Sequence, residues 1–380
     1  NDDLTNAQKI ELTKKDFNLI EADYNYKSKI NEKIKDLSNE ELGKLCMSNF
    51  SETDVPVPVA FLGEAGETNQ TIKGIDKFLI LVDGPTGLRI AKKYGVDEKG
   101  KYRLSQCVFL REQKDYMSPE EYAKADFPDN NKDRKGKVYY QSCTAIPIAT
   151  ALAQTFNEEF LETIGKNIIG EEMDLFNIQV WLAPGMCIHR NILCGRNFEY
   201  FSEDPLITGK MAAAIVRGVQ SHKNRACTVK HFACNNQESN RLNNNSMVSE
   251  RVLREIYMKA FKIAIEEGKP ICLMTSYNLI NGVHSSERRD LVIDVLRCEW
   301  GFDGLIMSDW YFSGVIPHKV SIHPAQMSSN NIRNGNNLQM FGQKNDYDVL
   351  MKAVKNGEVT REHLLEAASR VYNTIELLNQ

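Results

Sequence analysis

We predict an α/β chain, a (β/α)8 TIM-type barrel with an N-terminal helical extension. Three observations in the sequence predict this fold class. Short apolar segments alternate with amphipathic helical segments along most of the chain, which indicates a parallel sheet covered by helices. The apolar segments repeatedly end on polar residues, as strands do at the mouth of a barrel. No glycine-rich nucleotide loop follows any of them, which argues against the alternative, an open doubly wound sheet.

The N-terminal part is polar and has helical spacing. We predict that residues 1–34 are an extension and that residues 35–380 form the barrel domain. Ser38 is followed three residues later by Glu41, which is the pattern of a capping box and predicts a helix that begins there.

The remaining elements follow in a regular order. Apolar segments predict strands at residues 78–82, 178–182, 227–232, 271–277 and 305–307, with a further strand at 335–340. Amphipathic spacing predicts helices at residues 160–173, 211–219, from Ser249 onward, 291–300 and 361–378.

Residues 91–141 are rich in Lys, Asp and Tyr and are predicted to be a long surface insertion. Residues 129–133 resemble the start of a calcium loop. However, Arg134 stands where such a loop needs Gly, and Tyr140 stands where the closing Glu should be. The chain also has no CxxC pair and no HExxH motif. We therefore expect no metal and no cofactor.

Composition narrows the classes of partner and location. The chain has 380 residues, a net charge of −4 and no basic stripe interleaved with aromatics, so we expect no nucleic-acid partner. No apolar run approaches the roughly 18 residues of a membrane span, and we expect no membrane partner. The polar N-terminus shows no signal peptide, and nine cysteines without a disulfide spacing favour a reducing, cytoplasmic location. The sequence leaves homo-oligomerisation open.

Two predicted strands end on a carboxylate. Residues 305–307 lead to Asp309 beside Trp310, and residues 78–82 lead to Asp83 and a Gly-Pro-Thr-Gly turn. Barrel enzymes carry their chemistry at the carboxyl ends of the strands, which makes both residues candidates. An equally weighted alternative is that Asp309 only caps a following helix.

Further polar side chains lie at the strand ends and in the loops that follow. Each has a simple structural explanation, because His231 fits a satisfied core histidine, Arg196 can pair with Glu199 or Glu203 on the surface, and Trp310 fits the core. Together they predict a pocket for a neutral polyol, where Arg and Asp bind adjacent hydroxyls and the indole stacks on a sugar face. The candidates are Asp83, Arg89, Arg196, Lys230, His231, Arg241, Tyr277, Asp309 and Trp310.

Five stretches, taken in order, resemble the barrel domain of glycoside hydrolase family 3, in particular its bacterial β-glucosidases. They are residues 81–89; 182–186 through 189–190 to 194–200 and 202–205; 230–232 with 236–238 and 241; 274–278; and 301–304 through 308–310. Any one of them is a weak signal, but five in the family's order and spacing make the resemblance specific.

The resemblance implies a retaining, exo-acting β-glucosidase that hydrolyses terminal non-reducing β-D-glucosyl residues of a β-glucoside or oligosaccharide. Asp309 would be the nucleophile and form a covalent glycosyl-enzyme. The subsite for the terminal sugar would consist of Asp83, Arg89, Arg196, Lys230, His231, Arg241, Met274, Tyr277 and Trp310. We also expect the positive charge around Asp309 to lower its pKa.

The resemblance also implies that the acid/base Glu lies on a complementary α/β sandwich domain outside this chain. Single-domain relatives use a His in a Gly-His-Gly loop instead, but residues 233–236 here read Ala-Cys-Asn-Asn. The isolated chain is therefore expected to be weak on substrates whose leaving group needs a proton. Asn337 stands where the family usually has Asp. The alternatives are a non-catalytic sugar-binding barrel, a family 3 β-xylosidase or another exo-glycosidase.

Overall fold

The structure is a computed structural model, and it describes residues 23–24, 26–50, 65–104, 134–310, 323, 326–340 and 342–380. Most of the expected N-terminal extension lies outside these ranges. So do residues 129–133, the segment that resembles the start of a calcium loop.

A six-stranded sheet lies at the centre of the molecule. Its order is β1 (Gly66–Glu67), β2 (Ile80–Val82), β6 (Val180–Trp181), β7 (Ala226–Phe232), β9 (Cys272–Thr275) and β12 (Leu305–Met307). Neighbours from β2 to β12 are parallel, as the sequence predicts. The first strand, β1, departs from that expectation, because it runs antiparallel to β2.

Single backbone bridges extend this sheet around a ring. Met307 at the end of β12 pairs in parallel with Leu338, and the next residue, Gln339, pairs in parallel with Met47. Ser48 then pairs antiparallel with Thr68, which follows β1. The predicted strand at residues 335–340 is thus present only as bridges. The ring is a (β/α)8 barrel-type fold, and the predicted fold class is confirmed.

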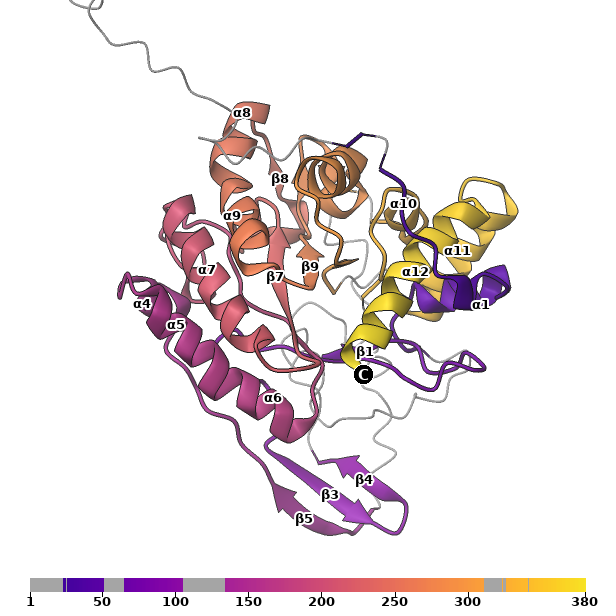
Figure 1. The fold of residues 1–380 in the computed structure, drawn as a ribbon, viewed down its shortest axis with the longest axis horizontal. Helices are drawn as coiled ribbons and strands as arrows, with labels where there is room; N and C mark the ends of the chain where they lie inside the picture. The colour runs from indigo at the N-terminus through magenta and orange to yellow at the C-terminus, as the bar shows by residue number, and fades with distance from the viewer. Residues whose placement is uncertain are drawn as a thin grey trace, which may run out of the picture.

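Alternate residues of the strands face two different core clusters, as the period of a strand requires. Ile80, Trp181, Val229, Leu273 and Ile306 belong to the cluster that includes residues of α5 (Glu158–Ile164), α7 (Pro205–Gln220) and α9 (Lys259–Gly268). Leu81, Val180, Met274, Leu305 and Met307 belong to the other, with residues of α1 (Asn39–Leu45) and α12 (Arg361–Leu378). In Figure 1 the two helix groups lie on opposite flanks of the sheet.

The helices agree closely with the sequence prediction. α1 has both halves of the capping box between Ser38 and Glu41, and α12 has the predicted bounds. The helix predicted at residues 160–173 is longer in the structure, because α5 continues through a π-helical segment at Gly165–Gly170 into α6 (Glu171–Phe176). Further α-helices are α4 (Ala149–Ala153), α8 (Glu250–Val252), α10 (Ser328–Arg333) and α11 (Lys344–Lys355), and residues Leu253–Tyr257 and Asp290–Glu299 are π-helical. Short 3-10 helices occur at Glu32–Ile34, Asn197–Glu199, Arg241–Asn243 and Ser285–Glu287.

The surface insertion forms a small antiparallel sheet. It consists of β3 (Lys93–Asp97), β4 (Gly100–Arg103) and β5 (Lys137–Tyr140), and it projects away from the body in Figure 1. A third sheet joins β8 (Asn245–Ser246), β10 (Leu279–Ile280) and β11 (Val283–His284). Within the described ranges, every cysteine is a free thiol, and no helix is both long and apolar enough to cross a bilayer.

Candidate functional site

Parallel strands of one barrel bring their carboxyl ends to the same side of the molecule. Asp83 directly follows β2, Lys230 and His231 lie near the end of β7, and Asp309 follows β12. The contacts between these side chains show that the strands do bring them together.

A chain of ion pairs links the end of β2 to the loop after β6. Asp83 Oδ2 lies 2.6 Å from Arg89 Nη2, and Asp83 Oδ1 lies 2.7 Å from Lys230 Nζ. Lys230 Nζ is also 4.0 Å from Glu199 Oε2, and Glu199 pairs with Arg196. Burial alone would raise the pKa of Asp83, but the charges of Lys230 and Arg89 outweigh it and hold this pKa well below its usual range.

The turn after β2 is built to hold Asp83 in place. Gly84 has a φ of +124°, and a Cβ added to it would lie 2.0 Å from the backbone oxygen of Gly87. Trp181 in β6 donates a hydrogen bond of 2.9 Å from Nε1 to the Gly84 oxygen. A residue with a side chain at position 84 would therefore displace the turn that carries Asp83.

His231 is a buried neutral imidazole. Arg196 Nη2 donates to its Nε2 at 2.9 Å, so the ring proton is assigned to Nδ1, which then donates to the Tyr200 hydroxyl at 3.1 Å. Burial lowers the pKa of His231 well below its usual value, and the charges of Arg196, Lys230 and Arg241 lower it further. His231 therefore holds Arg196 and Tyr200 in position and carries no extra proton to give away.

Asp309 is buried at the centre of this group. Its Oδ1 accepts a hydrogen bond of 2.7 Å from the Trp310 backbone, while its Oδ2 is buried, accepts no hydrogen bond from the described residues and lies 3.7 Å from His231 Nε2. Burial raises the pKa of Asp309 despite the charges of Arg196 and Arg241. The expectation that nearby charge lowers this pKa is therefore wrong, because desolvation outweighs it. The segment that Asp309 would cap, residues 311–322, lies outside the described ranges.

Tyr277 and Trp310 form a wall beside Asp309. The Tyr277 hydroxyl donates to the Trp310 backbone oxygen, and Trp310 Nε1 donates to the oxygen of Ala65 at 2.9 Å. The Arg241 guanidinium carbon lies 4.5 Å from the centroid of the Tyr277 ring. Burial raises the pKa of Tyr277 well above its usual value, and the charge of Asp309 raises it further.

Met274 differs from the other predicted site residues. It is buried in the core cluster that includes residues of α1 and α12, against which Trp310 also packs. The structure thus places Met274 in the apolar core on which the indole of Trp310 packs.

Two carboxyl groups of this region are absent from the predicted site. Glu199 was expected only as a surface partner of Arg196, but its side chain is 2% exposed. Glu238 is 21% exposed, its Oε2 lies 3.2 Å from Arg241 Nη1, and its Oε1 is buried without a hydrogen-bond partner among the described residues. Burial raises the pKa of Glu238, and the charges of Glu199 and Asp309 add to the rise. The i,i+3 spacing of Glu238 and Arg241 was the available sequence signal.

The arrangement suits a ligand with several hydroxyl groups. A hydroxyl both donates and accepts, so it can satisfy the buried acceptors Asp309 Oδ2, Glu238 Oε1 and Glu199 Oε2 while accepting from Lys230 or Arg196. The described part of the chain contains no group of three or more His, Cys, Asp or Glu side chains that could hold a metal ion.

Known proteins with a similar sequence or structure carry the same kind of domain. A model of the glycosyl hydrolase family 3 N terminal domain matches residues 131–374. Beta-glucosidase A of Butyrivibrio fibrisolvens is 52% identical over 171 residues, which are 45% of this chain and 20% of that protein. Beta-glucosidase B of Emericella nidulans is 35% identical over 288 residues, 73% of this chain and 32% of that protein.

A solved structure, beta-glucosidase 3B from Thermotoga neapolitana in complex with glucose, superposes with a TM-score of 0.70. It is 34% identical, and the match covers 90% of this chain and 42% of that one. This chain thus spans less than half the length of each of these relatives.

Proposed function

Because this chain belongs to glycosyl hydrolase family 3, whose N-terminal domain model matches residues 131–374, we propose that it is the barrel of an exo-acting β-glucosidase. It would release terminal non-reducing β-D-glucosyl residues with retention of configuration. The observation that supports this most directly is the buried Oδ2 of Asp309, which accepts no hydrogen bond from the described residues and lies just after β12 among side chains suited to sugar hydroxyls. Relatives named as beta-glucosidases support the substrate class.

In the proposed mechanism, Asp83, held ionised by Lys230 and Arg89, accepts hydrogen bonds from hydroxyls of the terminal sugar. Lys230 and Arg196 donate to others, and Trp310 packs against the sugar face. Asp309 Oδ2 attacks the anomeric carbon as the glycosidic bond breaks, and the leaving oxygen takes a proton from a carboxylic acid. Water then cleaves the glycosyl-aspartate ester, which gives net retention.

The proton donor is a separate question. His231 is neutral and its Nε2 lone pair is bound to Arg196, so it is not suited to the role. We propose that a Glu on a complementary α/β sandwich domain supplies the proton. Ile192 and Leu193, in the loop that also carries Arg196, are 91% and 84% exposed, which favours a further domain packed beside the site.

The domain assignment remains our proposal, with an extension at residues 1–34 and the barrel at residues 35–380. Part of that extension already packs on the barrel, because Ile34 is buried and the Asn31 backbone N–H donates to Ser369 Oγ in α12 at 2.9 Å.

Covalent labelling tests the nucleophile. A 2-deoxy-2-fluoro-β-glucoside with an activated leaving group should form a stable ester, which mass spectrometry should locate on Asp309. Asp309→Ala should abolish labelling and turnover. Asp348→Ala, which removes an exposed carboxylate of α11, should leave both unchanged. A label on any other carboxyl group would refute the assignment.

A comparison of two substrates tests whether the general acid lies outside this chain. This chain should slowly cleave an aryl β-glucoside whose leaving group needs no proton. It should cleave a β-linked disaccharide about 10²–10⁴-fold more slowly, because general acid catalysis usually contributes a factor of that size. Equal rates would indicate an acid within the chain, and Glu238 would then be the first residue to replace.

The alternative, a non-catalytic sugar-binding barrel, predicts glucose binding without labelling. In calorimetry, Asp83→Ala should make the free energy of glucose binding less favourable by about 2–5 kcal/mol, since two charge-assisted hydrogen bonds would be lost. The binding barrel would be favoured by two results together. Glucose binding would be weaker in Asp83→Ala than in wild type, and a complete enzyme would show no label on Asp309. Equal affinity in wild type and Asp83→Ala would remove Asp83 from the site.

A further inference from the structure

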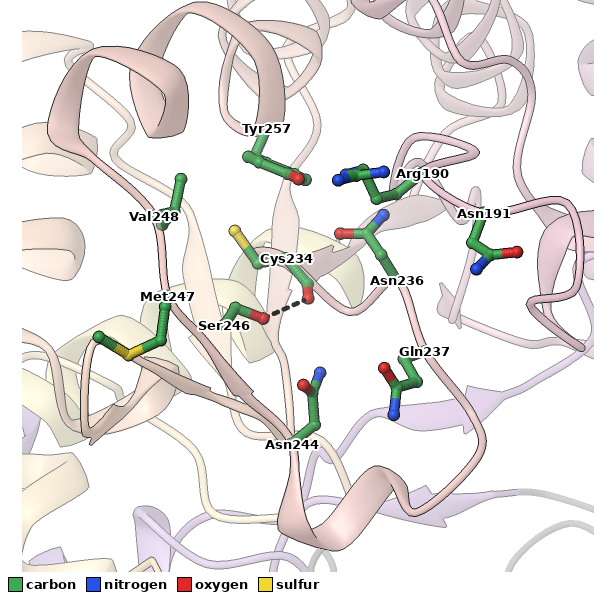
Figure 2. Close-up of a pocket in the computed structure, with 10 residues that line it drawn as sticks. All are labelled: Arg190, Asn191, Cys234, Asn236, Gln237, Asn244, Ser246, Met247, Val248 and Tyr257. Atoms are coloured by element: carbon green, nitrogen blue, oxygen red, sulfur yellow. Dashed lines mark hydrogen bonds between the residues drawn. The ribbon is translucent and has the colours of Figure 1, made fainter.

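A cavity of about 290 Å³ lies between the loops that follow β6 and β7. Arg190 belongs to the first loop, while Asn236, Gln237 and Asn244 belong to the second, and Met247 and Tyr257 form an apolar edge. Figure 2 shows these side chains around one space. None of the ten residues of the proposed glucoside site lines it.

Arg190 is exposed at the rim of the cavity and brings a positive charge that has no partner among the described residues. Its guanidinium makes no hydrogen bond or ion pair with any described residue, and no Asp or Glu is among the residues that line the cavity. A guanidinium presents several N–H donors in a plane that matches a carboxylate. The cavity therefore favours a ligand with an anionic group.

Asn236 supplies a buried acceptor. Its Nδ2 donates to the Ile188 oxygen at 2.5 Å, which fixes the orientation of the amide. Its Oδ1 is buried and accepts no hydrogen bond from the described residues. Figure 2 shows this side chain directed into the space between Arg190, Cys234 and Tyr257. Buried acceptors are normally satisfied, and a ligand hydroxyl would satisfy this one.

The wall of the cavity is anchored at both ends. Ser246 Oγ donates to the Cys234 oxygen at 3.2 Å, which closes the loop between them, as the dashed line in Figure 2 shows. Gln237 Nε2 donates to the Ser239 oxygen at 2.6 Å, so the amide oxygen of Gln237 is the part left for a ligand. The acceptors of Asn236 and Gln237 are thus carried by a loop with fixed ends, and Arg190 faces them from the loop that follows β6.

We propose that this cavity binds a small hydroxylated carboxylate, a sugar acid of monosaccharide size. Its carboxylate would pair with Arg190, and one of its hydroxyls would donate to Asn236 Oδ1. Met247 and Tyr257 would cover its C–H face. The volume lies just below the range of about 300–1,000 Å³ for ligand pockets, which favours a ligand of monosaccharide size over longer saccharides. This site does not depend on glucosidase activity.

Methionine-methyl NMR of the full chain tests the proposal. With ¹³C-methyl methionine, the signal of Met247, assigned through Met247→Leu, should shift on titration with D-glucuronate. D-glucose, which lacks the carboxylate, should shift it at least tenfold more weakly. Arg190→Gln should weaken glucuronate binding by about tenfold or more, the loss expected for one charge-assisted hydrogen bond. Arg333→Gln, which removes an exposed guanidinium on α10, should leave the titration unchanged.

Two further variants separate this cavity from the glucoside site and from misfolding. Asn236→Asp keeps the shape of the side chain but adds a charge that repels a carboxylate, so it should also weaken the binding of glucuronate. Asp83→Ala should leave the Met247 titration as in wild type. The proposal is overturned if Met247 responds equally to glucose and glucuronate, if Arg190→Gln binds as wild type does, or if Asp83→Ala removes the response.

Discussion

Replacing Lys230 with Met should lower the free energy of unfolding by about 3 kcal/mol. Breaking a buried ion pair by removing one partner costs about 3–5 kcal/mol, because the remaining charge stays buried. The Lys230 side chain is 4% exposed, and its ammonium lies 2.7 Å from Asp83 Oδ1 and 4.0 Å from Glu199 Oε2. The lower end of the range applies, since Asp83 is 23% exposed and keeps Arg89 as a partner.

A double-mutant cycle measures the pair itself. Urea unfolding of Lys230→Met, Asp83→Asn and the double variant should give a coupling energy of about 2 kcal/mol or more. The matched control is the pair of Lys210 and Glu267, which has a similar distance of 2.8 Å but is 36% and 37% exposed. Exposed pairs contribute about 0.2–1 kcal/mol, so the control cycle should give no more than that.

The dependence on pH provides a second check. The folded-state pKa of Asp83 lies below the unfolded value, so its ionisation stabilises the fold above the unfolded pKa of about 3.9. This stabilisation is lost as the pH falls from there toward the folded-state value. The stability difference between wild type and Lys230→Met should therefore shrink between pH 7 and pH 3. A coupling no larger than that of Lys210 and Glu267, or a difference that does not change with pH, would refute the reasoning.

Three further predictions concern the site and its support. Glu238→Gln should raise Tm, relative to wild type, more at pH 8 than at pH 4. Burial raises the pKa of Glu238, so its charged form costs stability above the pKa that Glu has in the unfolded chain. Equal Tm shifts at the two pH values in a thermal melt would contradict this. Asn337→Leu should cost about 3 kcal/mol in urea unfolding, since Nη2 of the buried Arg297 guanidinium loses its acceptor at 2.9 Å while Nη1 keeps the oxygens of Phe302 and Gly304. Asn337→Asp should be more stable than the Leu variant. Gly84→Ala should abolish glucose binding in calorimetry, whereas Gly100→Ala, also at positive φ but in open space, should preserve it.

The sequence predicted local features well because their causes are local. The capping box of Ser38 and Glu41 involves neighbouring residues, and the apolar stripe of α12 is set by helical spacing. The strands from β2 to β12 were recognisable as short apolar segments that end on polar residues. A right-handed strand-helix-strand repeat then leaves few topologies, which is why Asp83 and Asp309 could be placed at one end of the barrel.

The closure of the barrel could not be predicted from the sequence. The ring closes through single bridges at Met47, Ser48, Leu338 and Gln339, and such short pairings have no periodicity that a sequence could show. The reversed direction of β1 is likewise a property of the connection between distant segments. Burial was missed for the same reason. Glu199 reads as a surface partner of Arg196 by its spacing, but the fold leaves its side chain only 2% exposed.

The charges of the site explain why its residues could be recognised together but not one by one. Asp83, Glu199, Glu238 and Asp309 face Arg89, Arg196, Lys230 and Arg241, and the neutral His231 adds nothing to this balance. Any single pair in that set resembles an ordinary structural ion pair. As a set they leave a site with no net charge, which favours an uncharged polyol over an anion or a cation. The cavity beside Arg190 has the opposite character, since one positive charge there meets no carboxylate, and this contrast is why we assign a neutral sugar to the first site and a sugar acid to the second.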